Sequence, residues 1–356
     1  MTSPAELIHA TIAAIRPLDG PAMEQASQRQ AQLTKPPGSL GVLEQVAIDL
    51  AGITGTCPPA APQRPAVAVF AGDHGVLERG VSPWPQEVTV AMVENFRAGG
   101  AAVNVLARAC GAEVYVVDVG VATPVVGDER VLVRNVRRGT ADLGSGPAMS
   151  RAEAEEAIAV GIGVARELVA AGHDLLLTGD MGIGNTTPSA CLVAAFTGAS
   201  AAEVTGRGTG IDDETLILKT EIVRCAVDRL AEGADPIDVL AQVGGLEHAG
   251  LVGYLLGAAS AGVPVLLDGV IAGSAALVAQ ALAPDAISRS FAGHRSVEPG
   301  HAVALGQLGL TPLVDLDLRL GEGSGAALAV PILRAAALIL DEMATFDSAG
   351  VTRKED

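Results

Sequence analysis

The pattern of apolar and polar positions divides the chain into two regions. Up to about residue 53, apolar residues recur at helical spacing in "AELIHATIAAI" and "SLGVLEQVAIDLAGI", with a polar, glutamine-rich stretch between them. This spacing predicts a set of helices. The proline-rich segment "TCPPAAPQRP" follows, and its composition predicts a linker. Beyond it, short apolar runs alternate with longer segments of helical periodicity, which is typical of an α/β fold.

The short apolar runs predict a parallel sheet. The clear ones are "AVAVFAG", "EVYVVDVG", "DLLLTG" and "VPVLLDG", and "ISRSFAG" and "LVDLDLRLG" are less regular. The clear runs are apolar at nearly every position, so helices must cover both faces of the strands. The expected fold is therefore α/β, with a doubly wound, mainly parallel sheet. Ligands of such sheets bind beyond the carboxyl ends of the strands, so one shared site is expected near Asp73-His74, Asp118, Asp180 and Asp268.

Composition and charge exclude several classes of partner. The 356 residues carry a formal net charge of -18 and the basic residues are scattered singly, so we expect neither nucleic acid nor a membrane as a partner. Only 2% of the residues are aromatic and 43 are glycine, which favours an α/β enzyme over an all-β binding module. The four cysteines form no CxxC pair and the N-terminal segment lacks the basic start of a secretory signal, which together predict a cytoplasmic protein.

One apolar stretch, residues 249–267, is long enough to cross a membrane and carries no charge. Gly262 and Pro264 interrupt it, and Asp268 ends it. We therefore interpret this stretch as a buried helix followed by a strand.

The segment "TGDMGIGNTTPSA", residues 178–190, is the strongest candidate for a binding loop. It follows the apolar run "DLLL", and Thr187 with Pro188 predicts the N-cap and first residue of a helix. Such a turn presents free backbone N–H groups and the positive end of a helix dipole, which favours phosphate. A tight turn without a ligand would have the same sequence. The residues expected to bind phosphate are Gly182, Ile183, Gly184, Asn185, Thr186 and Thr187.

Lys219 is the candidate cation for that phosphate. Lysine is scarce and occurs only at positions 35, 219 and 354. Lys219 lies in "DDETLILKTEIVRCAV", which predicts a helix with Asp212 as its N-cap and one apolar face. The side chain either points its ammonium group at the phosphate loop or extends along the helix into solvent.

Asp73 and His74 directly follow an apolar run, where a metal site is one interpretation. No second His or Cys stands nearby at the spacing of metal ligands. We therefore interpret both residues as loop anchors and expect no metal.

A second candidate loop follows them and contains the only tryptophan of the chain. Two prolines stiffen it, which fits a wall for a flat ring but equally fits packing beneath a loop. The loop consists of Ser82, Pro83, Trp84, Pro85 and Gln86.

Glu322 is the candidate general base. It lies between Gly321 and Gly323, where an apolar segment ends and a long helical segment begins. The glycines let a ligand approach the backbone closely, and a partly dry site would raise the pKa of the carboxyl toward the range useful for a base. The alternative is an ordinary acidic residue in the first turn of a helix.

Together these motifs resemble those of one enzyme family. In order between about Lys35 and Leu333 occur "LTKPPGSLGVLE", "FAGDHGV", "VSPWPQEVT", "NFRAGGAAVNVLA", "GDMGIGNTT" and "LGEGSGAALAVPIL". In these motifs the chain resembles the nicotinate-nucleotide:dimethylbenzimidazole phosphoribosyltransferases of cobalamin assembly. The resemblance implies a homodimer in which residues 61–321 form a Rossmann-like α/β domain. Residues 1–60 and 322–356 would form a small helical domain built from both termini.

The resemblance also implies an activity. Family members transfer the phosphoribosyl group of nicotinate mononucleotide to 5,6-dimethylbenzimidazole or a related base, giving α-ribazole 5'-phosphate and nicotinate, without a cofactor. The general base of the family maps onto Glu322, its phosphate loop onto residues 182–187 and its helix lysine onto Lys219. Its benzimidazole pocket maps onto residues 82–86 together with Leu320.

Asp180 is a second candidate catalytic acid, but many relatives carry Glu at this position. The side chain of Asp180 is one methylene shorter, so its direct catalytic duty stays open. The role of Lys35 in "KPPGSLG" is open as well.

Two other functions are compatible with the fold class. A nicotinamide-dependent dehydrogenase would also be α/β and acidic, but no GxGxxG motif opens a helix after the first strand. A non-catalytic nucleotide-sensing protein would explain the phosphate loop without a role for Glu322.

Overall fold

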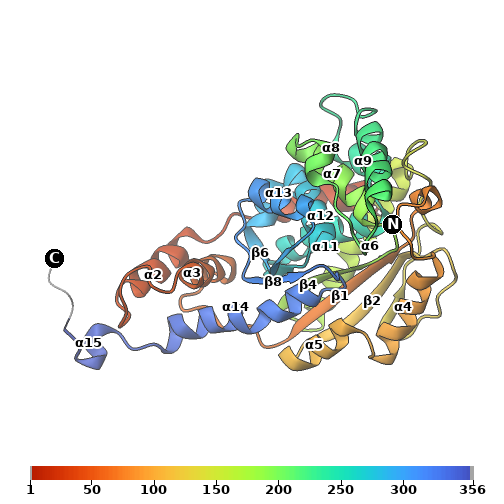
Figure 1. Ribbon diagram of the computed structural model, residues 1–356. Helices are drawn as coiled ribbons and strands as arrows, with labels where there is room; N and C mark the ends of the chain where they lie inside the picture. The colour runs from red at the N-terminus through yellow and green to blue at the C-terminus, as the bar shows by residue number, and fades with distance from the viewer. Residues whose placement is uncertain (1, 353–356) are drawn as a thin grey trace.

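A six-stranded parallel sheet forms the centre of the molecule (Figure 1). The computed structural model describes residues 2–352. The strand order β3-β2-β1-β4-β5-β6 confirms the predicted doubly wound, Rossmann-like sheet, because the winding reverses between the central strands β1 and β4. The strands are β1 (Pro65–Gly72), β2 (Glu113–Gly120), β3 (Val131–Val133), β4 (Leu175–Met181), β5 (Val265–Leu267) and β6 (Ser290–Ala292).

Two strands differ from the sequence prediction. β3 was not predicted, because three residues are too few to form a recognisable apolar run. The run "LVDLDLRLG" does contain a strand, β8 (Val314–Leu318), but β8 pairs with β7 (His294–Ser296) in a separate two-stranded sheet. No residue of β8 is buried, so β8 lacks the continuous apolar run of a strand that is covered on both faces.

Helices cover both faces of the central sheet. Side chains of β1 point alternately into two apolar cores, for example Ala68 and Phe70 into one and Val67 and Val69 into the other. The first core includes α1 (Pro4–Ala14), α6 (Arg151–Ala170), α7 (Thr186–Thr197), α10 (Pro236–Val243), α11 (Leu246–Ala261) and α12 (Val270–Leu282). The second includes α2 (Gly20–Gln30), α3 (Val42–Thr54), α4 (Glu87–Ala98), α5 (Ala102–Cys110) and α14 (Ser324–Glu342).

Most of the remaining helices also contribute residues to the first core, for example Val223 of α9 and Ala304 of α13. Asp212 caps α9 by accepting the N–H of Thr215 at 2.8 Å, as predicted for the helix that carries Lys219. These helices are α8 (Ala201–Val204), α9 (Asp213–Val227), α13 (Pro299–Leu308), α15 (Phe346–Ala349) and two 3-10 turns, Gly75–Arg79 and Pro284–Arg289.

The terminal helices occupy two places. α2, α3 and α14 pack together at one end of the molecule, where Leu33 also bridges to Thr345 (Figure 1). Lys35 belongs to this end, and its ammonium group pairs with Glu44 at 2.7 Å. By contrast, α1 packs against α6 and α11, with Ile8 buried in their core. The sequence analysis grouped α1 with the other terminal helices in a small domain. In the structure, α1 instead packs against helices that cover the central sheet.

Two apolar segments bear on membrane crossing. Residues 249–267 form most of α11, a left-handed turn at Gly262 and strand β5, as predicted. Among the described residues, α14 is the one helix long and apolar enough to cross a membrane. α14 packs against β4, β5 and α3. Buried core helices can have the same length and apolar composition as a membrane-spanning helix.

Helices α6 and α11 touch backbone to backbone. A Cβ atom added at Gly253 would lie 1.9 Å from the carbonyl oxygen of Ile158, and one added at Gly161 would lie 1.9 Å from that of Gly250. Only glycine lets the two helices approach this closely.

Gly253→Ala is therefore expected to lower the free energy of unfolding by at least about 2 kcal/mol, because the helices must separate to admit the methyl group. Chemical denaturation measures the change. Gly163→Ala, on the outer side of α6 where a Cβ meets nothing within 4 Å, is the control and should be neutral or slightly stabilising. Equal stability of the two variants would contradict the steric argument.

Candidate active site

The site lies where the winding of the sheet reverses. Asp73 and His74 follow β1, and Asp180 lies near the end of the neighbouring strand β4. A doubly wound sheet opens a crevice at this point, between loops that leave in opposite directions. The sequence prediction of a shared site at the carboxyl ends of the strands thus agrees with the topology.

The glycine loop connects β4 to α7 and approaches neighbouring backbone closely. A Cβ atom at Gly182 would lie 2.2 Å from the carbonyl oxygen of Gly72, so only glycine fits there. Gly184 has a φ of 89°, in the left-handed region that favours glycine. The N–H of Ile183 donates to Thr89 at 3.2 Å. These contacts fix the loop against the end of β1 and the start of α4.

The helix after this loop begins earlier than the sequence predicts. Asn185 is the N-cap of α7 and Thr186 its first residue, whereas Thr187 and Pro188 were predicted for these places. Pro188 sits in the first turn, where a backbone N–H has no intrahelical partner, so proline is tolerated there as well. Thr186 and Thr187 therefore belong to the first turn of α7.

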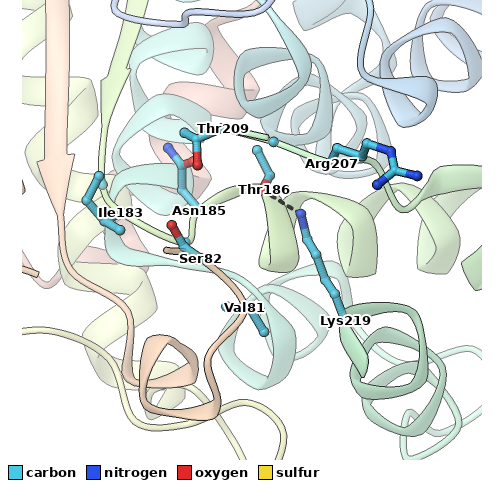
Figure 2. A pocket seen from close by; sticks show the side chains of 11 residues that line it. Val81, Ser82, Ile183, Asn185, Thr186, Arg207, Thr209 and Lys219 are labelled. Carbon is cyan, nitrogen blue, oxygen red and sulfur yellow. Dashed lines mark hydrogen bonds between the residues drawn. The ribbon is translucent and has the colours of Figure 1, made fainter. Parts of the chain in front are cut away.

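A narrow cavity of about 40 Å³ lies directly in front of this helix start. Figure 2 shows Lys219 reaching from α9 toward Thr186, with Asn185 and Ser82 also on the cavity wall. The combination of helix N–H groups, a hydroxyl and an ammonium group suits a phosphate monoester. The lining residues are Val81, Ser82, Gly182, Ile183, Gly184, Asn185, Thr186, Arg207, Gly208, Thr209 and Lys219.

Lys219 is buried and points into the cavity instead of solvent. Only 1% of the residue is exposed, and its Nζ donates to Thr186 Oγ1 at 2.8 Å and to the carbonyl oxygen of Gly206 at 3.0 Å. Burial lowers the pKa of its ammonium group to about 8, although the carboxylate of Glu298 acts in the opposite direction. The structure thus favours the interpretation in which Lys219 faces the glycine loop.

A second glycine-rich segment, residues 206–210, forms the opposite wall and was missed from the sequence. Gly208 has a φ of 52° and donates its N–H to Glu298 at 2.8 Å. Its carbonyl oxygen accepts from Arg319 at 3.0 Å. The spacing of glycines in "GRGTG" was the available signal, but no strand precedes it to mark the segment as a binding loop.

Asp180 lies behind the glycine loop. Its Oδ2 accepts from the amide of Asn185 at 2.9 Å, which ties the acid to the N-cap of α7. Burial raises the pKa of Asp180 well above its usual range, and the neighbouring carboxylate of Asp268 raises it further. Asp180 therefore resists ionisation and orients Asn185 at the cavity wall.

Glu322 lies in a turn that packs on the end of β4. A Cβ atom at Gly179 would lie 2.6 Å from the carbonyl oxygen of Glu322, so the turn rests directly on that strand. Oε2 of Glu322 accepts the N–H of Val103 at the start of α5, at 3.4 Å. Burial raises the pKa of Glu322, as the sequence analysis expected, with Val103 opposing and Asp268 adding to the rise. A buried carboxylate of this kind is suited to accept a proton.

His74, which was predicted as a loop anchor, belongs to a fully buried chain of polar side chains beneath the glycine loop, and the other members of the chain were missed. His74 Nε2 and His248 Nδ1 both lie 2.8 Å from Glu247 Oε1, and His248 Nε2 lies 2.8 Å from Ser189 Oγ. Ser189 Oγ in turn donates to the carbonyl oxygen of Asn185 at 2.9 Å. Burial opposes the charge on His74, but Glu247 raises its pKa. The chain joins the β1 loop to the glycine loop.

This chain contains Ser, His and Glu in the order of a hydrolase triad, but its geometry serves another purpose. Ser189 is fully buried and its hydroxyl proton is engaged by a main-chain carbonyl. No substrate can reach such a serine, so we interpret the chain as a support of the loop. Asp73, the other predicted anchor, accepts the N–H of Ala122 at 2.8 Å and holds the same region.

The proline-flanked loop forms an open groove of about 430 Å³ beside the phosphate cavity. Ser82 lines both, so the two spaces adjoin. Trp84 is 51% exposed and Leu320 is 57% exposed. Leu320 lines neither space, so the structure does not bring it together with the loop. The groove lining includes Leu77, Glu78, Ser82, Pro83, Trp84, Pro85, Gln86 and Glu87.

The described residues contain no group of three or more His, Cys, Asp or Glu side chains that could hold a metal ion.

A Rossmann-like sheet with a phosphate-sized cavity at its reversal point defines an α/β enzyme that handles phosphorylated substrates. The family model described as "Phosphoribosyltransferase" matches residues 15–351. A protein named nicotinate-nucleotide–dimethylbenzimidazole phosphoribosyltransferase from Salinispora tropica is 58% identical over 98% of this chain and 100% of its own length. One of the same name from Chloroflexus aggregans is 54% identical over 98% of this chain and 99% of its own length.

A crystal structure of the enzyme of that name from Thermus thermophilus superposes with a TM-score of 0.91, at 49% identity, covering 95% of this chain and 100% of that one. The chain belongs to the nicotinate-nucleotide–dimethylbenzimidazole phosphoribosyltransferase family, and it is accordingly a pentosyltransferase.

Proposed function

We propose that this enzyme transfers the phosphoribosyl group of nicotinate mononucleotide to 5,6-dimethylbenzimidazole, giving α-ribazole 5'-phosphate and nicotinate for the lower ligand of cobalamin. The observation that carries the proposal is the juxtaposition of two features at one sheet edge. A phosphate-sized cavity with Lys219 in its wall adjoins the end of β4, and the Glu322 turn packs on that same strand. Phosphate binding and proton removal therefore take place on the two sides of one crevice.

The glycine loop and Lys219 bind the 5'-phosphate. The N–H groups at the start of α7 and the ammonium group of Lys219 hold the ester, and residues 206–210 close the far wall. Fixing the phosphate places C1' of the ribose in the crevice between the two rings. Positioning of this kind contributes much of the rate enhancement of an enzyme.

Glu322 acts as the general base. One nitrogen of dimethylbenzimidazole donates its electron pair to C1', while the bond from C1' to the nicotinate nitrogen breaks and its electron pair neutralises the pyridinium ring. The carboxylate of Glu322 takes the proton of the other benzimidazole nitrogen. Attack opposite the leaving ring converts the β linkage to an α linkage. Asp180 contributes by holding Asn185 in the loop.

The groove around Trp84 either binds the acceptor base or forms the entrance to the pocket that binds it. Support comes from its place beside the phosphate cavity, with which it shares Ser82. We keep Leu320 as a proposed contact of the acceptor base because of the family resemblance, although it lines neither space in the structure.

A homodimer in the cytoplasm completes the proposal. Exposed apolar side chains on β8 and directly after β7 and β8 support an interface with a second copy next to the site; they are Leu316, Val297 and Leu320. The cysteines at positions 57, 110, 191 and 225 are unpaired thiols, as suits a reducing compartment. We propose neither nucleic acid nor a membrane as a partner.

The proposal is tested by incubating the purified enzyme with nicotinate mononucleotide and dimethylbenzimidazole. We expect equal amounts of nicotinate and α-ribazole 5'-phosphate, with the α configuration assigned by nuclear magnetic resonance. Release of nicotinate without a ribosylated base would indicate a hydrolase and contradict the proposal. Light scattering on the same sample tests the dimer.

A further inference from the structure

The turn that carries Glu322 is held by a side chain from a different strand. Asp268 directly follows β5, and its carboxylate accepts the N–H groups of Gly323 at 3.1 Å, Gly325 at 2.7 Å and Ala326 at 3.1 Å. The side chain of Asp268 is fully buried. α14 has no side-chain cap of its own, because Gly323 occupies the N-cap position. Asp268 therefore supplies the cap that the start of α14 lacks.

The turn needs such support. Gly321, Glu322 and Gly323 have φ values of 83°, 65° and 96°, so three successive residues lie in the left-handed region. Glutamate is disfavoured in that region and stays there only when its surroundings determine the conformation. Gly179 of β4 provides one contact surface for the turn, and Asp268 provides the hydrogen bonds.

Asp268 is itself anchored. Its backbone N–H donates to Thr178 Oγ1 on β4 at 2.9 Å. The hydrogen-bonded connection therefore runs from a central strand of the sheet through Asp268 to the start of α14. Among the described residues, Asp268 is the side chain that accepts hydrogen bonds from the N–H groups of Gly323, Gly325 and Ala326.

We propose that Asp268 is a positioning residue for Glu322, which fixes the Gly321–Glu322–Gly323 turn so that the carboxylate meets the proton of the incoming base. This inference rests on the proposed function, because that function makes Glu322 the general base. Asp268 itself does not contact the substrate in this proposal.

The charge of Asp268 gives this role a measurable signature. Burial raises the pKa of Glu322, the N–H of Val103 lowers it, and the carboxylate of Asp268 raises it. The other titratable groups around the turn are Asp180 at the end of β4 and His294 of β7, whose Nε2 lies 3.6 Å from Asp268 Oδ1. Removing the charge at position 268 should therefore lower the pKa of Glu322.

Asp268→Asn removes this charge. It also replaces one accepting oxygen by an amide N–H₂ group, which cannot accept a hydrogen bond from the backbone N–H groups of the turn. We expect kcat to fall about 10- to 100-fold, because a small misplacement of the base is costly. The KM for nicotinate mononucleotide should stay within about threefold of the original value, since the glycine loop is untouched. The acid limb of the kcat–pH profile should move to lower pH, because Glu322 then loses its proton more easily.

Asp268→Glu separates position from charge. It keeps the carboxylate but lengthens the side chain by one methylene, so kcat should fall while the acid limb stays in place. It also carries the test if the Asn variant does not fold. Asp174→Asn is the matched control, since Asp174 accepts the N–H groups of Gln63 and Arg64 at 2.8 and 2.7 Å at the opposite edge of the sheet. Neither kcat nor the acid limb should change in the control.

The outcomes distinguish this inference from the proposed function. Unchanged kcat in both Asp268 variants, alongside an inactive Glu322→Gln enzyme, would overturn the positioning role and leave the proposed function intact. An active Glu322→Gln enzyme would instead overturn the role of Glu322 on which the inference rests. Parallel losses of nicotinate mononucleotide binding and turnover in the Asp268 variants would show general damage to the site and also overturn the positioning role.

Discussion

Glu322→Gln is expected to lower kcat by about 10²- to 10⁴-fold, because the amide cannot take the proton that the benzimidazole ring must lose. The affinity for nicotinate mononucleotide should be retained, since the glycine loop and Lys219 lie on the phosphate side of the crevice. Stopped assays of nicotinate release measure the first effect, and calorimetric titration measures the second. A nucleotide-sensing protein would show no turnover to lose.

The thermal stability of the Glu322→Gln variant should not fall along with its turnover. Burial raises the pKa of Glu322 above its ordinary value of 4.5 in the folded chain. The ionised carboxylate is therefore unfavourable in the fold, and stability declines as the pH rises from 4.5 through the raised pKa. At neutral pH the Gln variant should melt no lower than the original enzyme, and any advantage should vanish below pH 4.5.

Glu342→Gln, at the exposed far end of α14, is the control for both measurements. It should change neither turnover nor melting temperature. Turnover that survives in the Glu322 variant would exclude this carboxylate as the base.

Lys219→Met is expected to weaken the binding of nicotinate mononucleotide by about 10- to 100-fold, the usual worth of a hydrogen bond to a charged group. The variant removes the ammonium group that points into the phosphate cavity but keeps an apolar stem to fill the space. kcat at saturating substrate should fall less than kcat/KM, because in the proposed function Lys219 binds the phosphate, which does not react.

The pH dependence gives a sharper test of Lys219. Burial lowers the pKa of its ammonium group to about 8, so the free enzyme loses this positive charge as the pH rises through about 8. The kcat/KM for nicotinate mononucleotide should decline there, and the decline should be absent from the Met variant. Arg224→Met is the control, because Arg224 lies on the same helix but pairs with Glu221 and Asp228 on the surface. A decline that persists in the Lys219 variant would assign the titration to another group.

The sheet could be predicted from sequence because its strands are buried on both faces. β1 and the first half of β4 are apolar at every position for that reason. β8 was placed in the wrong sheet because it is exposed, and β3 was not predicted because it is short. The start of α7 was placed at Thr187 because Thr-Pro is a common helix start, whereas the tertiary contact between Asn185 and Asp180 accompanies an earlier one.

The site was only partly predictable. Lys219 was recognised because lysine is rare in this chain, but only the structure shows its ammonium group inside the cavity. Glu247, His248 and Ser189 gave no signal, because a buried polar residue within an apolar segment cannot be distinguished from a surface residue by spacing alone. Asp268 was expected near the site, but its bonds to the start of α14 depend on contacts between distant segments.

The close contact between α6 and α11 has a consequence for how acceptor preference can change. α11 carries Glu247 and His248 in its first turn, and His248 lies 2.8 Å from Ser189 of α7, so the interlocked helices support the helix that follows the glycine loop. In the proposed function this support holds the sugar-phosphate end of the crevice, whereas Trp84, on the proposed acceptor side, is 51% exposed. Substitutions along that outer rim should retune which heterocycle is accepted at little expense to folding, while the nucleotide donor stays the same.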